Sequence, residues 1–169
     1  SCFNLSSIFF QDELVDFHSR FISKFFLKNN DVFYMSEICF LLNANLRLDF
    51  PLLNIKLRRS FLDNNILILS VGVIYNFNYF SFHLSNSFKG FLNLVEGKSP
   101  FCRRLLLSKF SLFIVGIESF CRTDGSSIYK MESILRKYLS KLSSVSQNTF
   151  FNYLLRNVSL VSSLEFGLI

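Results

Sequence analysis

The chain has 169 residues, half of them hydrophobic, and a formal net charge of +6. This length is enough for one domain with a sizeable core. The longest apolar runs, at 66–74 and 110–117, are about half as long as the roughly 20 residues that a membrane-spanning helix needs. We therefore expect no direct membrane span.

The four cysteines are isolated from one another. None belongs to a CxxC pair or has a histidine nearby, whereas metal sites need ligands clustered at short spacing. Cys39 falls within an apolar run, as is typical of a buried, unreactive thiol. The sequence therefore predicts reduced cysteines and no metal site.

The first part of the chain predicts a short strand at 8–10 and a helix at 12–28. Leu14, Phe17 and Phe21 recur at intervals of three and four residues, which is the spacing of an amphipathic helix. Acidic residues precede Arg20, the first arginine, so this segment does not have the composition of a transit or signal peptide. A short link at 32–36 follows.

The segment 37–73 predicts a strand, a helix and a second strand. The runs 38–42 and 66–73 are short, apolar and rich in branched residues, which favours strands that are buried on both faces. Between them, Pro51 suits the first position of a helix, and Asp63-Asn64-Asn65 suits its end. A βαβ unit of this kind requires a right-handed crossover and a parallel sheet.

The rest of the chain continues the alternation. We expect a loop at 75–86, helices at 87–96 and 99–108, a strand at 110–117 and a long helix at 125–142. A last amphipathic helix is expected from the spacing of apolar residues after the serine-rich turn, namely Phe150, Leu154, Leu155, Val158 and Val161.

This pattern predicts an α/β fold with a doubly wound, mainly parallel sheet. We divide it into an N-terminal strand and helix segment at 1–36, a βαβ core at 37–145, and a C-terminal amphipathic helix at 146–169. All three belong to one domain or to a piece of one.

Few residues suggest catalysis. No glycine-rich phosphate loop follows a strand, and the lone glycines Gly72 and Gly116 are expected to relieve packing. The histidines are His18, expected on a solvated helix face, and His83. No GxSxG nucleophile motif is present. We assign no catalytic residue.

The loop at 75–82 carries five aromatic rings. Such rings stack single-stranded bases when a positive groove holds the backbone, but no Lys or Arg occurs between Arg59 and Lys89. Core packing or a subunit contact is therefore the better interpretation.

Size, charge and aromatic content still leave two alternatives open. One is an organellar RNA-binding or ribosomal protein, for which counterion release predicts a steep salt dependence. The other is a free-standing α/β enzyme with a pocket near 43–47, at the carboxyl ends of the strands. We expect that end to be filled by Phe or Leu side chains or covered by a neighbour.

A more specific pattern lies at 41–62, which reads LLNANLRLDFPLLNIKLRRSFL. This segment resembles the molybdopterin-oxidoreductase-like domain of the large iron–sulfur subunit of respiratory complex I. That family has a strand followed by Gly-Thr-Asn-Pro-Arg, an acidic residue, Ala-Pro-Leu, and then Asn with Arg-Ile-Arg-Lys. The matching positions are Asn45, Arg47, Asp49, Pro51, Leu52, Asn54 and Arg58. Weaker matches keep the same order over almost the whole chain, among them Ser99-Pro100-Phe101 and the turn at 122–125.

The departures from the family pattern shape what the resemblance implies. Asn43 and Leu46 replace a Gly and a Pro of the loop that helps to hold the pterin nucleotide in molybdenum enzymes. We therefore expect no cofactor in this chain, with Asn43, Asn45 and Arg47 as a vestigial cofactor loop. The family's clusters are bound by cysteines of an N-terminal region that has no counterpart here, so iron–sulfur clusters are expected in a partner chain.

The resemblance thus implies a structural, cofactor-free piece of the large subunit of mitochondrial complex I. Such a piece supports NADH-to-ubiquinone electron transfer in the peripheral arm, and the chain alone is expected to be non-catalytic. The implied partners are other peripheral-arm subunits, including a separate chain with the cluster-binding half, and no nucleic acid. The implied location is the matrix side of the mitochondrial inner membrane. The preference for Phe, Leu and Ser over Ala, Gly and Val is typical of a T-rich organelle genome.

Overall fold

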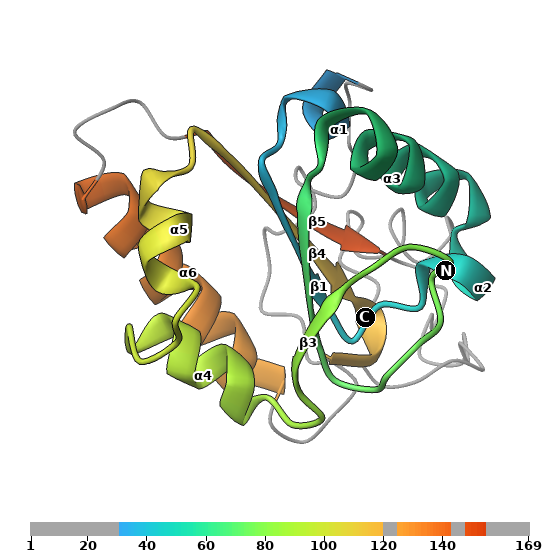
Figure 1. Ribbon diagram of the computed structural model, residues 1–169. Helices are drawn as coiled ribbons and strands as arrows, with labels where there is room; N and C mark the ends of the chain where they lie inside the picture. Colours follow the sequence, from blue (N-terminus) through green and yellow to red (C-terminus); the bar gives the residue numbers. More distant parts are fainter. Residues whose placement is uncertain (1–30, 120–124, 143–147, 155–169) are drawn as a thin grey trace, which may run out of the picture.

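A computed structural model gives the structure of the protein and describes residues 31–119, 125–142 and 148–154. These residues form one sheet of five strands with helices on both faces (Figure 1). In chain order the elements are α1 (Asp31–Met35), β1 (Ile38–Leu42), α2 (Leu46–Asp49), α3 (Pro51–Asn64), β2 (Leu67–Val71), β3 (Phe82–Ser85), α4 (Lys89–Val95), α5 (Cys102–Leu107), β4 (Phe110–Gly116), the 3₁₀ turn η3 (Ile117–Ser119), α6 (Gly125–Leu142) and β5 (Asn148–Leu154).

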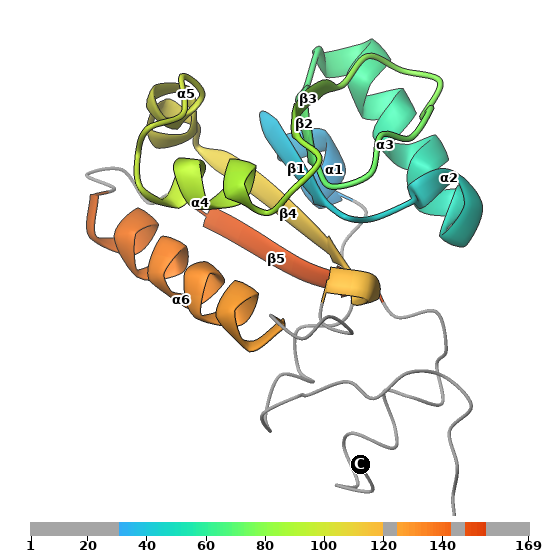
Figure 2. The ribbon, with the colours of Figure 1, turned by 90° about the horizontal axis from the view of Figure 1, so that it is seen from below.

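All five strands run parallel, in the order β3-β2-β1-β4-β5. Helices α4, α5 and α6 lie on one side of the sheet, and α1 and α3 lie on the other (Figures 1 and 2). The predicted doubly wound α/β fold is therefore confirmed. Every residue of β1 and of β2 is buried, which explains why their sequences are continuous apolar runs instead of alternating ones.

The sheet separates two hydrophobic cores, because successive side chains of a strand point to opposite faces. Ile38 and Phe40 join the core beneath α4, α5 and α6, whereas Cys39 and Leu41 join the core beneath α1 and α3. On the first side, three rings stack across neighbouring strands. The centre of the Phe113 ring lies 4.6 Å from that of Phe40 and 4.4 Å from that of Phe151, and in both pairs the ring planes are nearly parallel. The in-register pairing of β1, β4 and β5 produces this column.

Helix α3 begins and ends where the sequence predicts. Pro51 occupies its first turn, where no intrahelical partner is needed for the missing N–H. At the other end Asn65 adopts the left-handed conformation (φ 51°), and its N–H donates to the Phe61 carbonyl. Asn tolerates this conformation better than most residues. Leu57 is fully buried against the sheet, and Leu53 and Phe61 pack against the same core.

The predicted C-terminal helix at 146–169 is wrong over 148–154. These residues form β5, which pairs with β4 in register along its whole length, from Phe110↔Asn148 to Gly116↔Leu154. The apolar spacing that suggests a helix also fits a strand in which Phe151 and Tyr153 face one core and Leu154 the other. Phe, Tyr and Thr favour strands, and the pairing with β4 selects the strand over the helix. The predicted remainder of that helix, the strand at 8–10 and the helix at 12–28 lie outside the described residues.

Smaller differences concern short elements. The predicted loop at 75–86 contains the four-residue edge strand β3, which pairs with β2. The link at 32–36 is largely the short helix α1. Helix α5 begins at Cys102, later than the predicted Ser99-Pro100 start, because those residues form a turn in which the Cys102 N–H donates to the Ser99 carbonyl.

Candidate functional site

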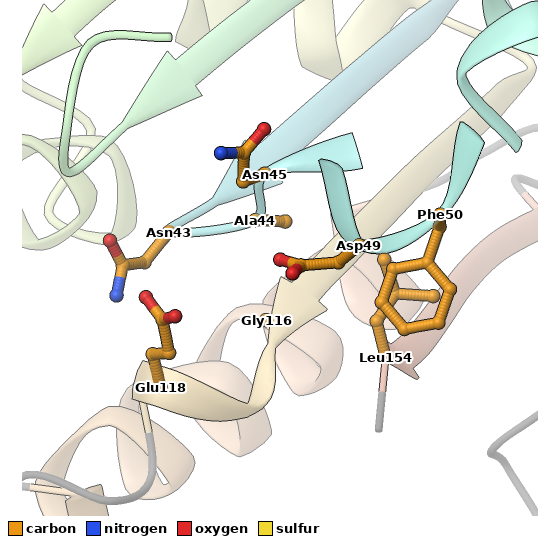
Figure 3. A pocket seen from close by; sticks show the side chains of 8 residues that line it. All are labelled: Asn43, Ala44, Asn45, Asp49, Phe50, Gly116, Glu118 and Leu154. Atoms are coloured by element: carbon orange, nitrogen blue, oxygen red, sulfur yellow. The ribbon is translucent and has the colours of Figure 1, made fainter. Parts of the chain in front are cut away.

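The natural ligand edge of this sheet lies between β1 and β4. The chain leaves β1 toward β2 and β3 on one side, and leaves β4 toward β5 on the other. Such a topological switch point is where open α/β sheets bind ligands, beyond the carboxyl ends of the strands. A cavity lies there, lined by Asn43, Ala44, Asn45, Asp49, Phe50, Gly116, Glu118 and Leu154 (Figure 3).

This cavity has a volume of only about 10 Å³, which is room for one water molecule at most. Sites for small ligands usually enclose about 300–1,000 Å³. Phe50 and Leu154 form part of the wall, which agrees with the expectation that Phe or Leu side chains fill this end. The enzyme alternative predicts an open pocket here, and the residues that the structure describes do not form one.

The cavity is small because the loop after β1 is pressed between two strand ends. A Cβ atom at Gly116 would overlap the carbonyl oxygen of Asn43 and lie 3.0 Å from its carbonyl carbon. On the other side Gly72 has a φ of +107°, and a Cβ there would lie 2.9 Å from the Asn43 Oδ1. Asn43 itself is left-handed, with a φ of 46°. The prediction that both glycines relieve packing is confirmed, and both do so against one residue.

The three residues of the expected vestigial loop separate in space. Asn43 and Asn45 line the cavity, but Arg47 does not. The Asn45 Oδ1 caps α2 by accepting the Leu48 N–H at 3.4 Å. The exposed Arg47 guanidinium donates instead to the Asn76 carbonyl, at 3.2 Å, and so ties α2 to the aromatic loop. The side chains of Asn45 and Arg47 thus each make a structural hydrogen bond.

Two carboxylates at the cavity, those of Asp49 and Glu118, were not among the predicted site residues. Figure 3 shows the Glu118 carboxylate on the same side of the cavity as the Asn43 amide. No lysine or arginine is among the lining residues, and a lining whose charged groups are acidic disfavours the phosphates of a nucleotide. The sequence does mark Asp49, which occupies the acidic position of the 41–62 motif. Glu118 has no such signal, because only the fold brings it to the same cavity.

His83 lies away from this edge, on β3. Its Nδ1 is 3.3 Å from the Ser70 hydroxyl and its Nε2 is 2.8 Å from the Asn86 Oδ1. This arrangement is that of a serine–histidine–amide relay. However, Ser70 lies within β2, an interior strand of the sheet, and is only 6% exposed. The relay therefore joins β3 to β2 and exposes no nucleophile. His18 lies outside the described residues.

The described cysteines are Cys39 and Cys102. Cys39 is fully buried, and burial raises the pKa of its thiol, which keeps it protonated and unreactive. The Cys102 thiol donates to the Leu94 carbonyl at 3.4 Å. Within the described residues, no group of three or more His, Cys, Asp or Glu side chains could hold a metal ion. Cys2 and Cys121 lie outside those residues.

Three of the five rings in the aromatic loop pack inward. Phe77 is buried in the core beneath α3, and Tyr75 and Tyr79 pack against the same core. The Phe77 and Tyr79 rings are stacked at 5.5 Å, and Tyr79 meets Phe61 of α3 at 6.2 Å. Core packing is thus confirmed for these three rings, while Phe80 is exposed. Rings that are engaged in a core offer no platform for bases.

Five parallel strands in the order 3-2-1-4-5, covered by helices on both faces, define a Rossmann-like α/β protein with its switch point between β1 and β4. The family model for molybdopterin oxidoreductase matches residues 5–169. The chain belongs to the molybdopterin oxidoreductase family.

Several curated relatives are similar to most of the chain. The NADH-ubiquinone oxidoreductase 75 kDa subunit of Reclinomonas americana is 35% identical over 90% of this chain and 21% of the relative. The protein of the same name from Acanthamoeba castellanii is 33% identical over 56% of this chain and 13% of the relative. That from Dictyostelium discoideum is 30% identical over 66% and 17%. The resemblance found in the sequence is therefore confirmed, and the chain spans about a fifth of the length of the relatives or less.

Among the described residues, no helix combines the length and the apolar character needed to cross a bilayer.

Proposed function

We propose that this chain is a structural, cofactor-free part of the large subunit of mitochondrial complex I. In this role it supports NADH-to-ubiquinone electron transfer in the peripheral arm and does not itself carry electrons. The observation that carries the proposal is the similarity to the 75 kDa subunit over 90% of the chain, combined with a switch-point cavity of about 10 Å³.

The residues at the switch point do not fit the molybdopterin cofactor that the family name implies. The cavity holds no more than one water, two carboxylates line it, and the Asn43 backbone occupies the space next to Gly116. A nucleotide-bearing pterin needs a much larger site with partners for its phosphates. The chain's own residues therefore support a scaffold role better than a redox role.

The remaining parts of the proposal concern partners and location. Iron–sulfur clusters are held by sets of cysteine thiolates, and the two described cysteines are a fully buried thiol and a thiol bound to a carbonyl. We infer that a separate chain with the cluster-binding half of the subunit, together with other peripheral-arm subunits, packs against this one. We place the complex at the mitochondrial inner membrane, on its matrix side.

Native-gel separation of mitochondrial membranes tests this function. The gel is stained for NADH dehydrogenase activity, and peptides of the chain are quantified by mass spectrometry in each slice. The proposal predicts that these peptides peak in the active high-mass band together with other complex I subunits. A peak at the mass of the free chain, or with ribosomal proteins, would refute it.

A further inference from the structure

Helix α3 has apolar residues on both of its sides. Toward the sheet it presents Leu57, which is fully buried, with Leu53 and Phe61 packed against the same core. On the opposite side it presents Leu52, Ile55 and Leu62. A surface helix normally carries charged and polar residues on its outer side. Helix α3 does carry four charged residues outside its buried row, but Leu52, Ile55 and Leu62 lie among them as exposed apolar side chains.

The outward residues form a continuous exposed row. Leu52, Ile55 and Leu62 are 74%, 61% and 66% exposed, and Leu48 of α2 continues the row at 76%. Leu52, Ile55 and Leu62 are spaced by three and seven residues, which places them on one face of α3, whereas the non-helical Phe50 separates Leu48 from that helix. Leu52 and Leu62 are ten residues apart, so the row on α3 is about 15 Å long at 1.5 Å per residue. We call Leu48, Leu52, Ile55, Arg58 and Leu62 the outer α3 face.

The charges on this face are cationic. Arg58 lies between Ile55 and Leu62 along the face, is exposed, and makes no ion pair within the described residues. Arg59, four residues after Ile55 and three before Leu62, lies on the same face and is engaged, with its Nε 3.5 Å from an Asp63 carboxylate oxygen and its guanidinium carbon 6.0 Å from the centre of the Tyr34 ring. A partner that covers the leucines must therefore present a carboxylate near Arg58, because a buried cation without a counter-charge is costly.

These charges argue against a second copy of the chain as the occupant. In a two-fold dimer the same patch of each subunit meets itself. In such a dimer both copies of Arg58 would enter a contact whose Asp63 carboxylates are already engaged by Arg59, so the two guanidinium groups would lack a counter-charge. A partner with an apolar row and acidic residues has no such cost.

We infer that the outer α3 face is the docking site for an apolar helix, flanked by carboxylates, of a neighbouring polypeptide in the assembly. This inference rests on the proposed function, since it names the kind of partner that the proposed structural subunit binds. The matched Reclinomonas americana relative is about four times as long as this chain, since 153 aligned residues are 21% of its length, so the proposed subunit includes ample sequence to supply such a helix.

Zero-length cross-linking of the purified native complex tests the chemistry of this contact. Carbodiimide joins an amine to a carboxylate that it touches, and Arg58→Lys places an amine at the position where the inference requires a carboxylate of the partner. We expect this substituted side chain to be joined to an aspartate or glutamate of another polypeptide of the complex. Cross-links only to a second copy of this chain, only within the chain, or not at all would overturn the inference.

Substitution tests the same contact by assembly. Ile55→Asp places a charge on the outer α3 face, and Ile134→Asp does the same at an exposed position of α6, on the other side of the sheet. We expect Ile55→Asp to lower the amount of chain in the complex at least about 30-fold, as for a central interface residue, and Ile134→Asp to leave it within about two-fold. Equal effects would overturn the inference.

The remaining outcomes are also decisive. Circular dichroism of the purified Ile55→Asp and Ile134→Asp chains shows whether each is folded, and the cross-linking result does not depend on those two variants. Binding of the purified chain to anionic lipid vesicles that Ile55→Asp abolishes would mean that the face meets a membrane, and would overturn the inference. If the chain is recovered in the complex but no other polypeptide covers the outer α3 face, this inference alone is refuted. If the chain is absent from the complex, the proposed function is refuted as well.

Discussion

Replacement of Gly116 by alanine is expected to destabilise the protein strongly, because the atoms in the way belong to the backbone. The added Cβ would overlap the Asn43 carbonyl oxygen and lie 3.0 Å from its carbonyl carbon and 3.1 Å from the Ala44 Cα. Ordinary carbon contacts lie at about 3.5–4.0 Å. The end of β4 and the loop after β1 must therefore separate, which over-packing data put at about 1–3 kcal/mol. The same shift strains the hydrogen bond from the Asn43 N–H to the Val71 carbonyl (2.8 Å), which is worth about 1 kcal/mol.

We therefore expect Gly116→Ala to lower the free energy of unfolding by about 2–4 kcal/mol. Urea denaturation of the purified chain, followed by circular dichroism, measures it. With a urea dependence of about 2 kcal/mol per molar, the midpoint falls by roughly 1–2 M. Gly97→Ala is the matched control, because Gly97 has a φ of +77° but no atom within 4 Å of an added Cβ. Its cost is the backbone strain alone, about 1–2 kcal/mol. A Gly116→Ala protein as stable as the unmodified chain would refute the closed switch point.

Three further predictions follow from the packing and the buried thiol. Phe113→Ala removes a ring stacked between two others at 4.6 and 4.4 Å and should lower the free energy of unfolding by about 3–5 kcal/mol in the same assay. Phe80→Ala, at an exposed ring, should change it by less than about 0.5 kcal/mol. Equal losses would contradict the assignment of Phe113 to the core. Asn65→Ala should cost about 1 kcal/mol, because Asn65 is left-handed, whereas Asn65→Gly should be neutral or stabilising; the reverse order would contradict this cap. The raised pKa of the Cys39 thiol keeps its proton on in the folded state, while the unfolded thiol loses it above about pH 8.5, so stability should fall with rising pH from there by up to about 1.4 kcal/mol per unit. Burial also raises the pKa of Tyr79, which adds a further loss of stability above about pH 10. Cys39→Ala should therefore reduce the fall in stability between about pH 8.5 and pH 10. An unchanged fall in this range would contradict the burial of the Cys39 thiol as its cause.

The elements that the sequence predicts correctly are those with strong local patterns. The apolar runs of β1 and β2 can be satisfied only by burial on both faces. Pro51 and Asn65 fix the ends of α3 through their own backbone preferences. These signals come from a few neighbouring residues, so they can be recognised without knowledge of the tertiary fold.

The errors have a common cause in pairing between distant segments. The apolar spacing in 148–154 fits a helix or a strand, and only the register with β4 selects the strand. Likewise β3 is short and lies at the sheet edge, paired with β2 alone, so its own residues carry little strand signal. Long-range contacts of this kind override local propensity.

The candidate site could be predicted only in part. The loop of Asn43 and Asn45 was identified correctly as the end of β1, and Gly72 and Gly116 as packing positions. That both glycines enclose the same asparagine depends on β1 lying between β2 and β4. The cavity carboxylate of Glu118 is likewise brought there by the strand order.

The most direct test of the scaffold account is the iron and acid-labile sulfide content of the purified, folded chain. The account predicts no stoichiometric iron or sulfide, even after reconstitution with ferrous iron and sulfide under reducing conditions. Iron and sulfide bound in a fixed ratio to each chain would contradict it, because the chain would then hold a cluster of its own.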